Sequence, residues 1–323
     1  MIITYYEPLH ADGRTLRGRR RPVPDWTLPT RSSDGRWVPG PWVTARTLGP
    51  LSIRANGVLV LAAADLPRWA HFGTVLARVE TDGDEPVTDG KDHIGADITR
   101  RGVRRARPVS LVEGWTDEAI RCWAYECIDR AVRLHAPSAL EAAGFIGHAD
   151  RLRRLTRVVD GATARAAEGA AMMAAEPWDD DTDGPGDGPE EWTSAWFAAH
   201  HAADSARLFA AEEDEEDEHP DDLLKDDEDP AVLACDAEDA AEAQGSEAPR
   251  LIAAAERAAK YAATLTRQTA GNAGEAAAEG AGPAVEEDMG SAFRRLMNIG
   301  FRATRAEYEW QSARLAELVG IGL

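Results

Sequence analysis

The sequence predicts an α+β protein in which a small N-terminal mixed α/β domain precedes an Ala-rich helical bundle with acidic linkers. Three observations indicate this class. Short apolar runs bounded by Gly, Pro and Asp fill the first 115 residues, the hydrophobic period lengthens to about 3.6 residues from Thr116, and acidic runs interrupt the second half. With 323 residues, the chain has room for two domains.

We therefore expect four segments along the chain. They are an α/β domain at residues 1–115, a helical region at 116–176, an acidic linker with one or two helices at 177–247, and C-terminal helices at 248–323 that complete the bundle. Six of the ten tryptophans lie at or before Trp123, so the better core is expected in the first part.

The N-terminal segment contains nearly all of the strand predictions, which share β-branched or alternating apolar residues and turn residues at their ends. The predicted strands are residues 2–6, 42–45, 51–53, 58–61, 75–80 and 107–113, and a short helix is predicted at 64–72.

Helices are predicted from Thr116 onward by apolar residues at three- and four-residue steps. The first contains Ile120, Trp123, Cys127, Ala131 and Leu134. Ser138 and Glu141 have capping-box spacing and predict the start of a second helix, and a third is predicted from Leu152 towards Met173. A long last helix is predicted by a repeat that includes Phe293, Leu296, Gly300, Phe301, Thr304, Tyr308, Gln311, Leu315 and Leu318.

Charge is distributed unevenly along the chain. Residues 1–116 hold 17 Lys and Arg against 13 Asp and Glu, or +4, which leaves 19 basic and 44 acidic residues, or −25, for the remainder. So acidic a surface repels phosphate backbones, which argues against nucleic-acid binding by the C-terminal part and favours a basic protein as partner.

The three cysteines, Cys122, Cys127 and Cys235, have neither disulfide nor metal spacing, and we expect buried, unreactive thiols. The N-terminus lacks a basic segment followed by an apolar run, and no stretch approaches about 18 apolar residues. We therefore expect a cytoplasmic protein without a membrane span.

One metal motif occurs in the acidic segment. Its residues follow the calcium-loop pattern D-x-D-x-D-G-x5-E, in which carboxylate oxygens surround the ion and the glycine allows a sharp turn; they are Asp179, Asp181, Asp183, Gly184 and Glu190. However, Pro177 interrupts the entering helix, Pro185 disturbs the loop, and no second loop is available for pairing. We interpret the segment as an acidic linker and expect no metal site.

Three other groups of polar residues occur in the sequence. His200 and Asp204 share a helical face, but two ligands are not a metal site. Two arginine groups have the composition of a phosphate-binding patch, or of a surface that neutralises the acidic segments; they are Arg17, Arg19, Arg20, Arg21 and Arg100, Arg101, Arg104, Arg105. Since no nucleotide-binding, nucleophile or zinc motif is present, we assign no catalytic residue and expect no cofactor.

The N-terminal segment and the end of the last helix resemble an uncharacterised family of phage and actinobacterial proteins. The resemblance lies at residues 37–40, 49–58, 65–69, 76–80 and 309–315. Members have a Cys-x-x-Gly-Phe/Leu-His strand, a short helix, a Val-Glu-Val-x-Gly strand and Ala-rich C-terminal helices. Arg54 stands in place of the Cys and Leu59 in place of the His, so the resemblance implies no chemistry that depends on those two residues.

Residues 56–60 also resemble a Gly-rich strand of the ADP-ribosyltransferase core, and the acidic helical part is similar in composition to helical immunity proteins. Together these observations favour a non-enzymatic protein-interaction module with an acidic helical surface, of phage or actinobacterial type. The alternative is an enzyme or degenerate enzyme, similar to an ADP-ribosyltransferase, in the N-terminal domain.

We predict that the segment 179–190 does not bind calcium at physiological concentration, because its proline-disturbed loop prevents the carboxylates from converging. Calorimetric titration of the full chain should show no heat of binding with a micromolar dissociation constant. Micromolar binding that is abolished by Glu190→Gln would overturn this prediction.

Overall fold

The computed structural model describes residues 4–13, 26–45, 57–68, 75–82, 87–88, 100–175, 198–204, 206–207 and 289–322, with only the backbone at 87–88, 100 and 289–301. The described residues contain both helices and strands, which confirms the α+β class. The chain divides into two compact units. Unit 1 contains the described residues up to Arg121 and those from Ser312 onward, and unit 2 contains the described residues from Cys122 to Gln311.

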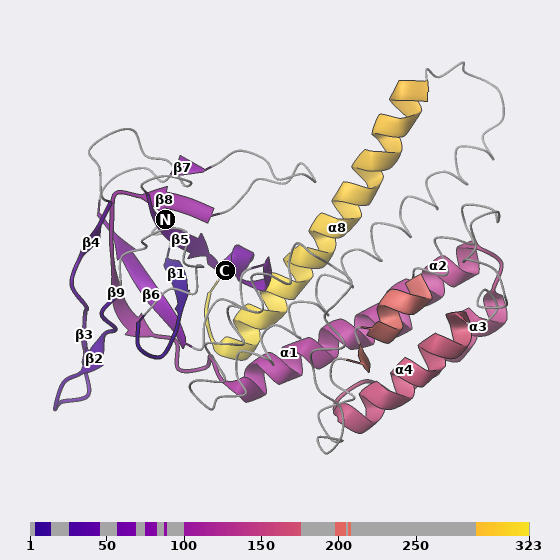
Figure 1. Cartoon of the computed structure of the whole chain (residues 1–323), viewed down its shortest axis with the longest axis horizontal. Coiled ribbons are helices and arrows are strands. Elements are labelled where there is room, and N and C mark those ends of the chain that lie inside the picture. Colours follow the sequence, from indigo (N-terminus) through magenta and orange to yellow (C-terminus); the bar gives the residue numbers. More distant parts are fainter. Residues whose placement is uncertain are drawn as a thin grey trace. The chain divides into compact units, whose positions relative to one another are not determined.

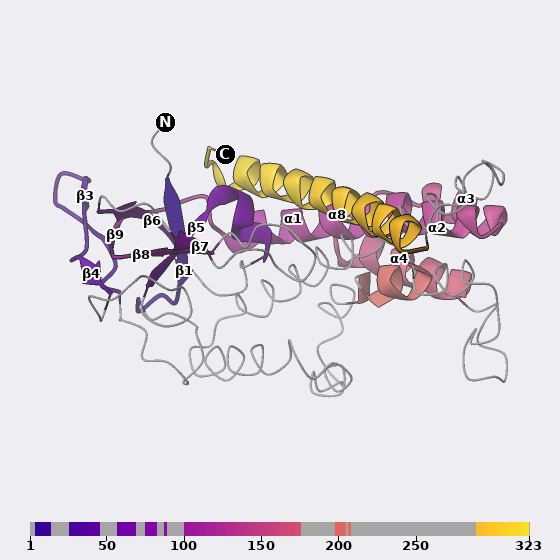
Figure 2. The same ribbon diagram turned by 90° about the horizontal axis from the view of Figure 1, so that it is seen from above.

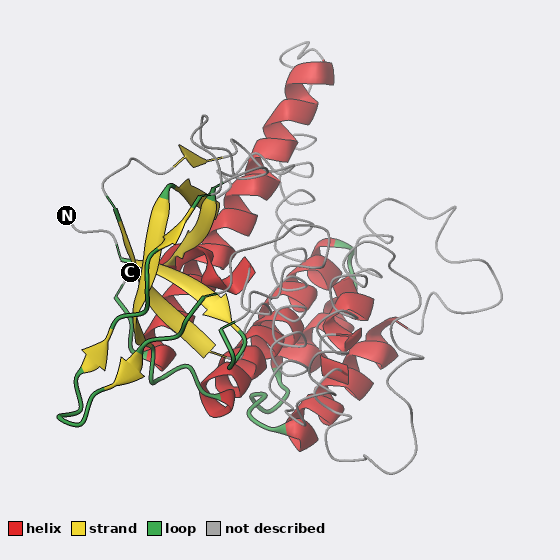
Figure 3. Cartoon of the chain, turned by 60° about the vertical axis from the view of Figure 1, so that its left-hand side comes forward, coloured by secondary structure: helices red, strands yellow, loops and turns green. Residues whose placement is uncertain are grey.

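Unit 1 is built on a seven-stranded antiparallel sheet with the strand order β4-β9-β6-β1-β5-β8-β7 (Figure 1). The strands are β1 (Tyr5–Leu9), β4 (Val43–Thr44), β5 (Val58–Ala62), β6 (Val75–Thr81), β7 (Val87–Thr88), β8 (Arg100–Val103) and β9 (Arg105–Leu111). A separate hairpin is formed by β2 (Thr30–Arg31) and β3 (Trp37–Val38). All the strands of the described residues, yellow in Figure 3, belong to unit 1.

Alternation along the strands gives the sheet two different faces. The first, which we call the core face, carries one apolar cluster made of Tyr5, Leu9, Trp26, Val43, Val58, Val60, Ala77, Val79, Val103 and Ala106. The second face carries Tyr6, Arg78 and Glu80 from the central strands, because these residues alternate with the core residues. Burial of this cluster contributes apolar stabilisation to unit 1.

The structure finds strands at five of the six predicted places and leaves one outside the described residues. The predicted strands 2–6, 42–45, 58–61, 75–80 and 107–113 correspond to β1, β4, β5, β6 and β9 with shifted ends, and 51–53 is not described. The predicted helix 64–72 is in its described part a 3-10 helix, η1 (Ala63–Arg68), with Pro67 inside it. Strand β8 has no apolar pattern that predicts it, since it reads Arg-Arg-Gly-Val.

The C-terminal end of helix α8 (Met289–Val319) packs within unit 1. Ser312 Oγ donates a hydrogen bond of 2.7 Å to the carbonyl oxygen of Ala64, and Leu315 and Val319 are buried. Gly114 lies so close to the backbone of Val319 that a Cβ added at Gly114 would fall 2.4 Å from the Val319 carbonyl oxygen. The helix predicted to complete the bundle therefore also supplies core residues to unit 1.

Helix α8, yellow in Figure 2, is one continuous helix of 31 residues. The other helices of the described part are α1 (Asp117–Arg130), the π-helical turn η3 (Ala131–His135), α2 (Ala136–Ala142), α3 (Ile146–Arg153) and α4 (Gly161–Ala175), and residues 198–204 and 206–207 are also helical. The start of α1 agrees with the prediction, since Thr116 Oγ1 accepts a hydrogen bond from the Ala119 amide.

The capping-box prediction at Ser138 and Glu141 is wrong. Helix α2 begins at Ala136 as a continuation of α1 through η3, so Ser138 lies inside it and its hydroxyl donates to the Leu134 carbonyl at 2.8 Å. The cause is Pro137, which has no N–H for the carbonyl four residues earlier. The chain instead widens into a π turn, in which the Ala136 N–H bonds to the carbonyl of Ala131.

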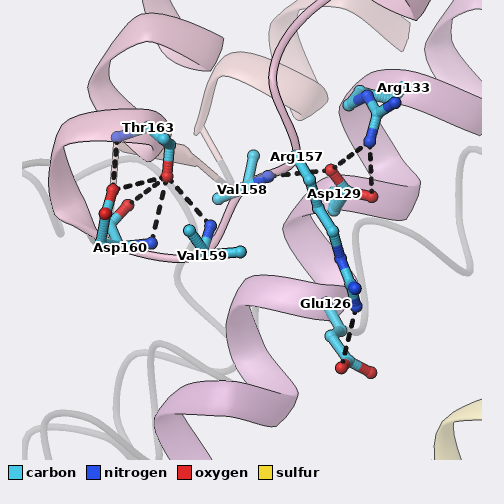
Figure 4. A network of polar contacts seen from close by, with 8 residues as sticks. All are labelled: Glu126, Asp129, Arg133, Arg157, Val158, Val159, Asp160 and Thr163. Carbon is cyan, nitrogen blue, oxygen red and sulfur yellow. Dashed lines mark hydrogen bonds and ion pairs between the residues drawn. The ribbon is translucent and has the colours of Figure 1, made fainter.

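The single helix predicted from Leu152 towards Met173 is interrupted. Helix α3 ends at Arg153 and α4 begins at Gly161, after a connection that side chains fasten to α1 (Figure 4). Asp129 accepts the Val158 amide at 2.9 Å, and Arg157 pairs with Glu126 at 3.0 Å. Asp160 then caps α4 by accepting the Thr163 amide at 2.8 Å.

Alanine forms the buried stripe of α4, at Ala164, Ala167, Ala171 and Ala174. Small side chains at this spacing bury little apolar area each but let backbones approach closely. Within the described residues, no helix has the length and low charge content needed to cross a membrane.

We predict that Gly114→Ala lowers the free energy of unfolding by about 1–3 kcal/mol, the usual cost of overpacking, because the new methyl group meets the Val319 backbone. Gly169→Ala is the matched control, since this exposed helical glycine has no atom within 4 Å of an added Cβ. It should leave stability unchanged or raise it by about 0.5–1 kcal/mol. Urea unfolding followed by tryptophan fluorescence and circular dichroism measures both; equal effects would contradict the close approach at Gly114.

Candidate functional site

The buried face of α8 is polar in its middle. Thr304, Glu307, Gln311 and Ser312 are all buried, at the three- and four-residue spacing that normally carries apolar side chains. Glu307 is the ionisable member, and only 1% of its side chain is exposed. A buried carboxylate needs partners for its charge and both oxygens, so its surroundings define the candidate site in unit 2.

Three side chains surround the Glu307 carboxylate. Arg130, the last residue of α1, donates from Nε to Oε1 at 3.1 Å and from Nη2 to Oε2 at 2.5 Å. His135, the last residue of η3, lies with Nε2 3.1 Å from Oε2, and Gln311 Nε2 donates to Oε1 at 3.2 Å. We call Glu307, Arg130, His135 and Gln311 the carboxylate cluster.

The π turn explains how Arg130 and His135 reach the same carboxylate. In an α-helix, residues five apart differ by about 140° around the axis and point in different directions. In a π turn, hydrogen bonds join residues five apart, so Arg130 and His135 occupy neighbouring turns of one face. Pro137 therefore has a consequence beyond the helix backbone, because it positions a second donor for Glu307.

Opposing effects determine the ionisation of Glu307. Burial acts to raise its pKa, but hydrogen bonds from His135 and Arg130, with the positive charges these groups carry when protonated, overcome it and lower the pKa from 4.5 to about 2. The carboxyl group is therefore fully ionised near neutral pH.

Aromatic residues and a thiol complete the surroundings. The Arg130 guanidinium lies 4.0 Å from the centre of the Trp310 ring, a cation–π contact, and Trp123 Nε1 donates to the Gln311 carbonyl at 3.2 Å.

Burial raises the pKa of the Cys127 thiol well above its usual range, with a further contribution from Glu307. Cys127 is thus an unreactive thiol, as expected, whereas Cys122 is exposed, contrary to expectation, and Cys235 lies outside the described residues.

The hydrogen-bond acceptors of the Glu307 carboxylate are occupied by groups of the carboxylate cluster. Both Glu307 oxygens already accept hydrogen bonds, from Arg130 and Gln311 on one side and from Arg130 and His135 on the other. A general base or a nucleophile needs a lone pair directed at its substrate, and this carboxylate has none to spare. We therefore assign it a structural role, in fastening α8 to α1 and η3.

The carboxylate cluster is not predicted from the sequence. The repeat in the last helix includes Thr304 and Gln311 but not Glu307, which completes the spacing between them, because a charged residue is expected on the exposed face of a helix. Two signals were available: a glutamate in the apolar register, and a proline two residues after a histidine inside a long helical pattern.

Two described members of the second arginine group, Arg101 and Arg105, contact other side chains of the sheet. Arg105 pairs with Asp82 at 2.8 Å and lies 4.9 Å from the Trp42 ring centre, and Arg101 lies 5.7 Å from the Tyr5 ring centre. The neighbouring Arg107 also stacks on Trp42, at 4.6 Å, and pairs with Glu80 at 2.7 Å. Arg17, Arg19, Arg20 and Arg21 lie outside the described residues, as does the Arg100 side chain.

The other sequence candidates are placed only in part. The calcium motif, Asp179 to Glu190, lies outside the described residues. His200 is half-buried and Asp204 is exposed on the helical segment 198–204. Among the residues that the structure describes, no three His, Cys, Asp or Glu side chains are grouped so that they could hold a metal ion.

The described helices are not the acidic part of the chain. From Asp117 to Ala175 there are eight acidic and eight basic residues, a net charge of zero. Residues 177–247 hold 26 acidic and 2 basic residues, a net charge of −24. The acidic character of the chain therefore resides in this segment, most of which lies outside the described residues.

Comparisons with protein-family models, with curated proteins and with solved structures gave no match to this chain. The resemblances at residues 37–80 and 56–60 accordingly stay predictions.

We predict that Glu307→Gln lowers the free energy of unfolding by about 3 kcal/mol, because it removes the partner of a largely buried guanidinium. Glu309→Gln is the matched control on the same helix, since Glu309 forms only an exposed pair with Arg305 and should change stability by less than about 0.5 kcal/mol. Urea unfolding measures both variants, and a Glu307→Gln effect as small as the control would contradict the assigned role.

The lowered pKa also predicts a pH dependence. Because the folded pKa lies below 4.5, the ionised carboxylate stabilises the fold by about 3 kcal/mol above pH 4.5, and this stability is lost as the pH falls towards 2. Unfolding at a series of pH values should therefore show a steeper loss in the wild type than in Glu307→Gln. If the free energy of unfolding fell with pH equally in the wild type and in Glu307→Gln, the lowered pKa of Glu307 would not be the cause of the pH dependence.

Proposed function

We propose that the chain is a non-enzymatic protein-interaction module of phage or actinobacterial type, in which acidic segments recruit a basic protein. The observation that carries this proposal is the concentration of charge, with a net −24 between residues 177 and 247. Runs of like charge, such as that at residues 212–218, often serve as interaction segments. Opposite charge on that partner would accelerate encounter and make association sensitive to salt.

The finer architecture belongs to the same proposal. A small mixed α/β domain and an Ala-rich helical bundle would act as rigid supports, and acidic linkers would carry the contact. Since residues 117–175, which contain α1 to α4, have no net charge, the proposed acidic surface depends on the segments 212–218 and 226–229. A cytoplasmic location is proposed with it.

The contacts of the described polar groups support a function that does not involve catalysis. The buried Glu307 carboxylate of unit 2 accepts hydrogen bonds from its partners at both oxygens, and Arg105 and Arg107 are paired on the sheet. The alternative, an enzyme or degenerate enzyme similar to an ADP-ribosyltransferase in the N-terminal domain, stays a prediction, because only residues 57–60 of its motif are described.

We predict that replacing the eleven acidic residues at 212–218 and 226–229 with Ser or Asn abolishes salt-sensitive capture of a basic protein from an extract of the native host. The matched control exchanges Glu for Asp and Asp for Glu at the same positions, which preserves the charge and should preserve capture. Immobilised full-length chains and mass spectrometry at low and high salt measure the effect, since salt screens charge over about 8 Å at physiological ionic strength.

Two results would overturn the proposal. Equal capture by the neutralised and charge-preserving variants would show that the acidic residues do not recruit the partner. Stronger capture by the neutralised variant would indicate that the acidic segments cover the basic residues of the N-terminal domain and inhibit it.

A further inference from the structure

Three hydrogen-bond donors lie in one row on the second face of the sheet. In the strand register, Tyr6 of β1 is opposite Arg78 of β6, and Arg78 is opposite Ser110 of β9. Directly opposed residues of antiparallel strands project to the same face with Cβ atoms about 5 Å apart. The row therefore gathers a phenol, a guanidinium and a hydroxyl on three adjacent strands of unit 1.

Arg78 differs from the other arginines of this face. Arg105 and Arg107 each pair with an acid, Asp82 and Glu80 respectively, on the neighbouring strand. Within the described residues, Arg78 has neither an ion pair nor a hydrogen bond, and its Nε is buried without a partner. Among the described residues, its positive charge is thus the one on the paired strands β6 and β9 that no carboxylate balances.

An unbalanced, half-buried guanidinium is unfavourable unless something compensates for it. Leu61, opposite Tyr6, and Leu76, two residues from Arg78, are fully buried and lower the polarity around the row. Low polarity strengthens any interaction with a charged partner. Burial also raises the pKa of Tyr6, against a smaller opposite effect of Arg78, so the phenol keeps its proton and can donate it in a hydrogen bond.

A backbone irregularity lies at the same place. The register between β6 and β9 shifts between Arg78 and Val79, so that Arg78 is opposite Ser110 while Val79 is opposite Pro108. Such bulges redirect side chains and recur beside binding sites. Here the bulge brings Ser110 to the same face as Arg78, which an unbroken register would have given to Val109.

We propose that the row Tyr6–Arg78–Ser110 binds an oxyanion, the carboxylate or phosphate group of a small ligand. A guanidinium presents parallel N–H groups that match two oxygens of either anion, and the flanking hydroxyls donate to the remaining oxygens. This site is independent of the acidic segments, so its test is separate from that of the proposed function.

The test is titration of the full-length protein with inorganic phosphate and, separately, with acetate, at constant ionic strength. Amide resonances of Arg78 and Ser110 and calorimetry report the binding. We expect saturable, millimolar binding of at least one anion, weakened about tenfold or more by Arg78→Gln, since a hydrogen bond to a charged group is lost, and about threefold by Ser110→Ala. Arg36→Gln, which removes the same charge from an exposed hairpin residue, should change affinity less than twofold.

Tighter binding of phosphate identifies a phosphate ligand and tighter binding of acetate a carboxylate ligand, and both support the site. The proposal is overturned if neither anion saturates, or if Arg36→Gln weakens binding as much as Arg78→Gln. Circular dichroism checks the fold of each variant. If Arg78→Gln does not fold, Ser110→Ala and Tyr6→Phe decide, and unchanged affinity in both overturns the proposal.

Discussion

A carboxylate buried on a long helix requires hydrogen-bond donors from the elements that pack around it. Glu307 meets this requirement through Arg130, His135 and Gln311, which come from the end of α1, from η3 and from α8 itself. Leaving one member of such a cluster unpaired is costly, so the alignment of these elements is strongly constrained. Apolar contacts alone would not have this effect, because alanine-rich stripes such as that of α4 fit together in several registers.

Elements with a strong local signal were predictable from the sequence. Residues 58–61 and 75–80 alternate or run apolar between turn residues, and the α1 region repeats every three or four residues, so their types follow from local pattern. Helix ends and irregular turns were not predictable in the same way. The π turn depends on the absence of one N–H at Pro137, and the break after Arg153 depends on Asp129 and Glu126, which lie far away in the sequence.

The polar clusters were the least accessible to sequence reasoning. Arg130 and Glu307 are 177 residues apart, and Arg78 and Ser110 are joined only by strand register. Nothing local distinguishes Glu307 from an exposed glutamate. Nor does anything local distinguish Arg78, which has no carboxylate partner among the described residues, from Arg107, which has one. Charge composition, in contrast, is fully readable, and it separates the strongly acidic segment 177–247 from helices that are electrically neutral.

The widened turn at residues 131–135 also limits how this helix can change in length. A π turn accommodates one residue more than the α-helical path, so removing a single residue there would restore regular winding. The helix beyond would then keep its orientation, and the imidazole, four residues after the guanidinium in a regular α-helix, would still face the carboxylate. An insertion of one residue there would instead turn the helix beyond by about 100° and carry the imidazole away, so insertions at this position are expected to be far less tolerated than single deletions.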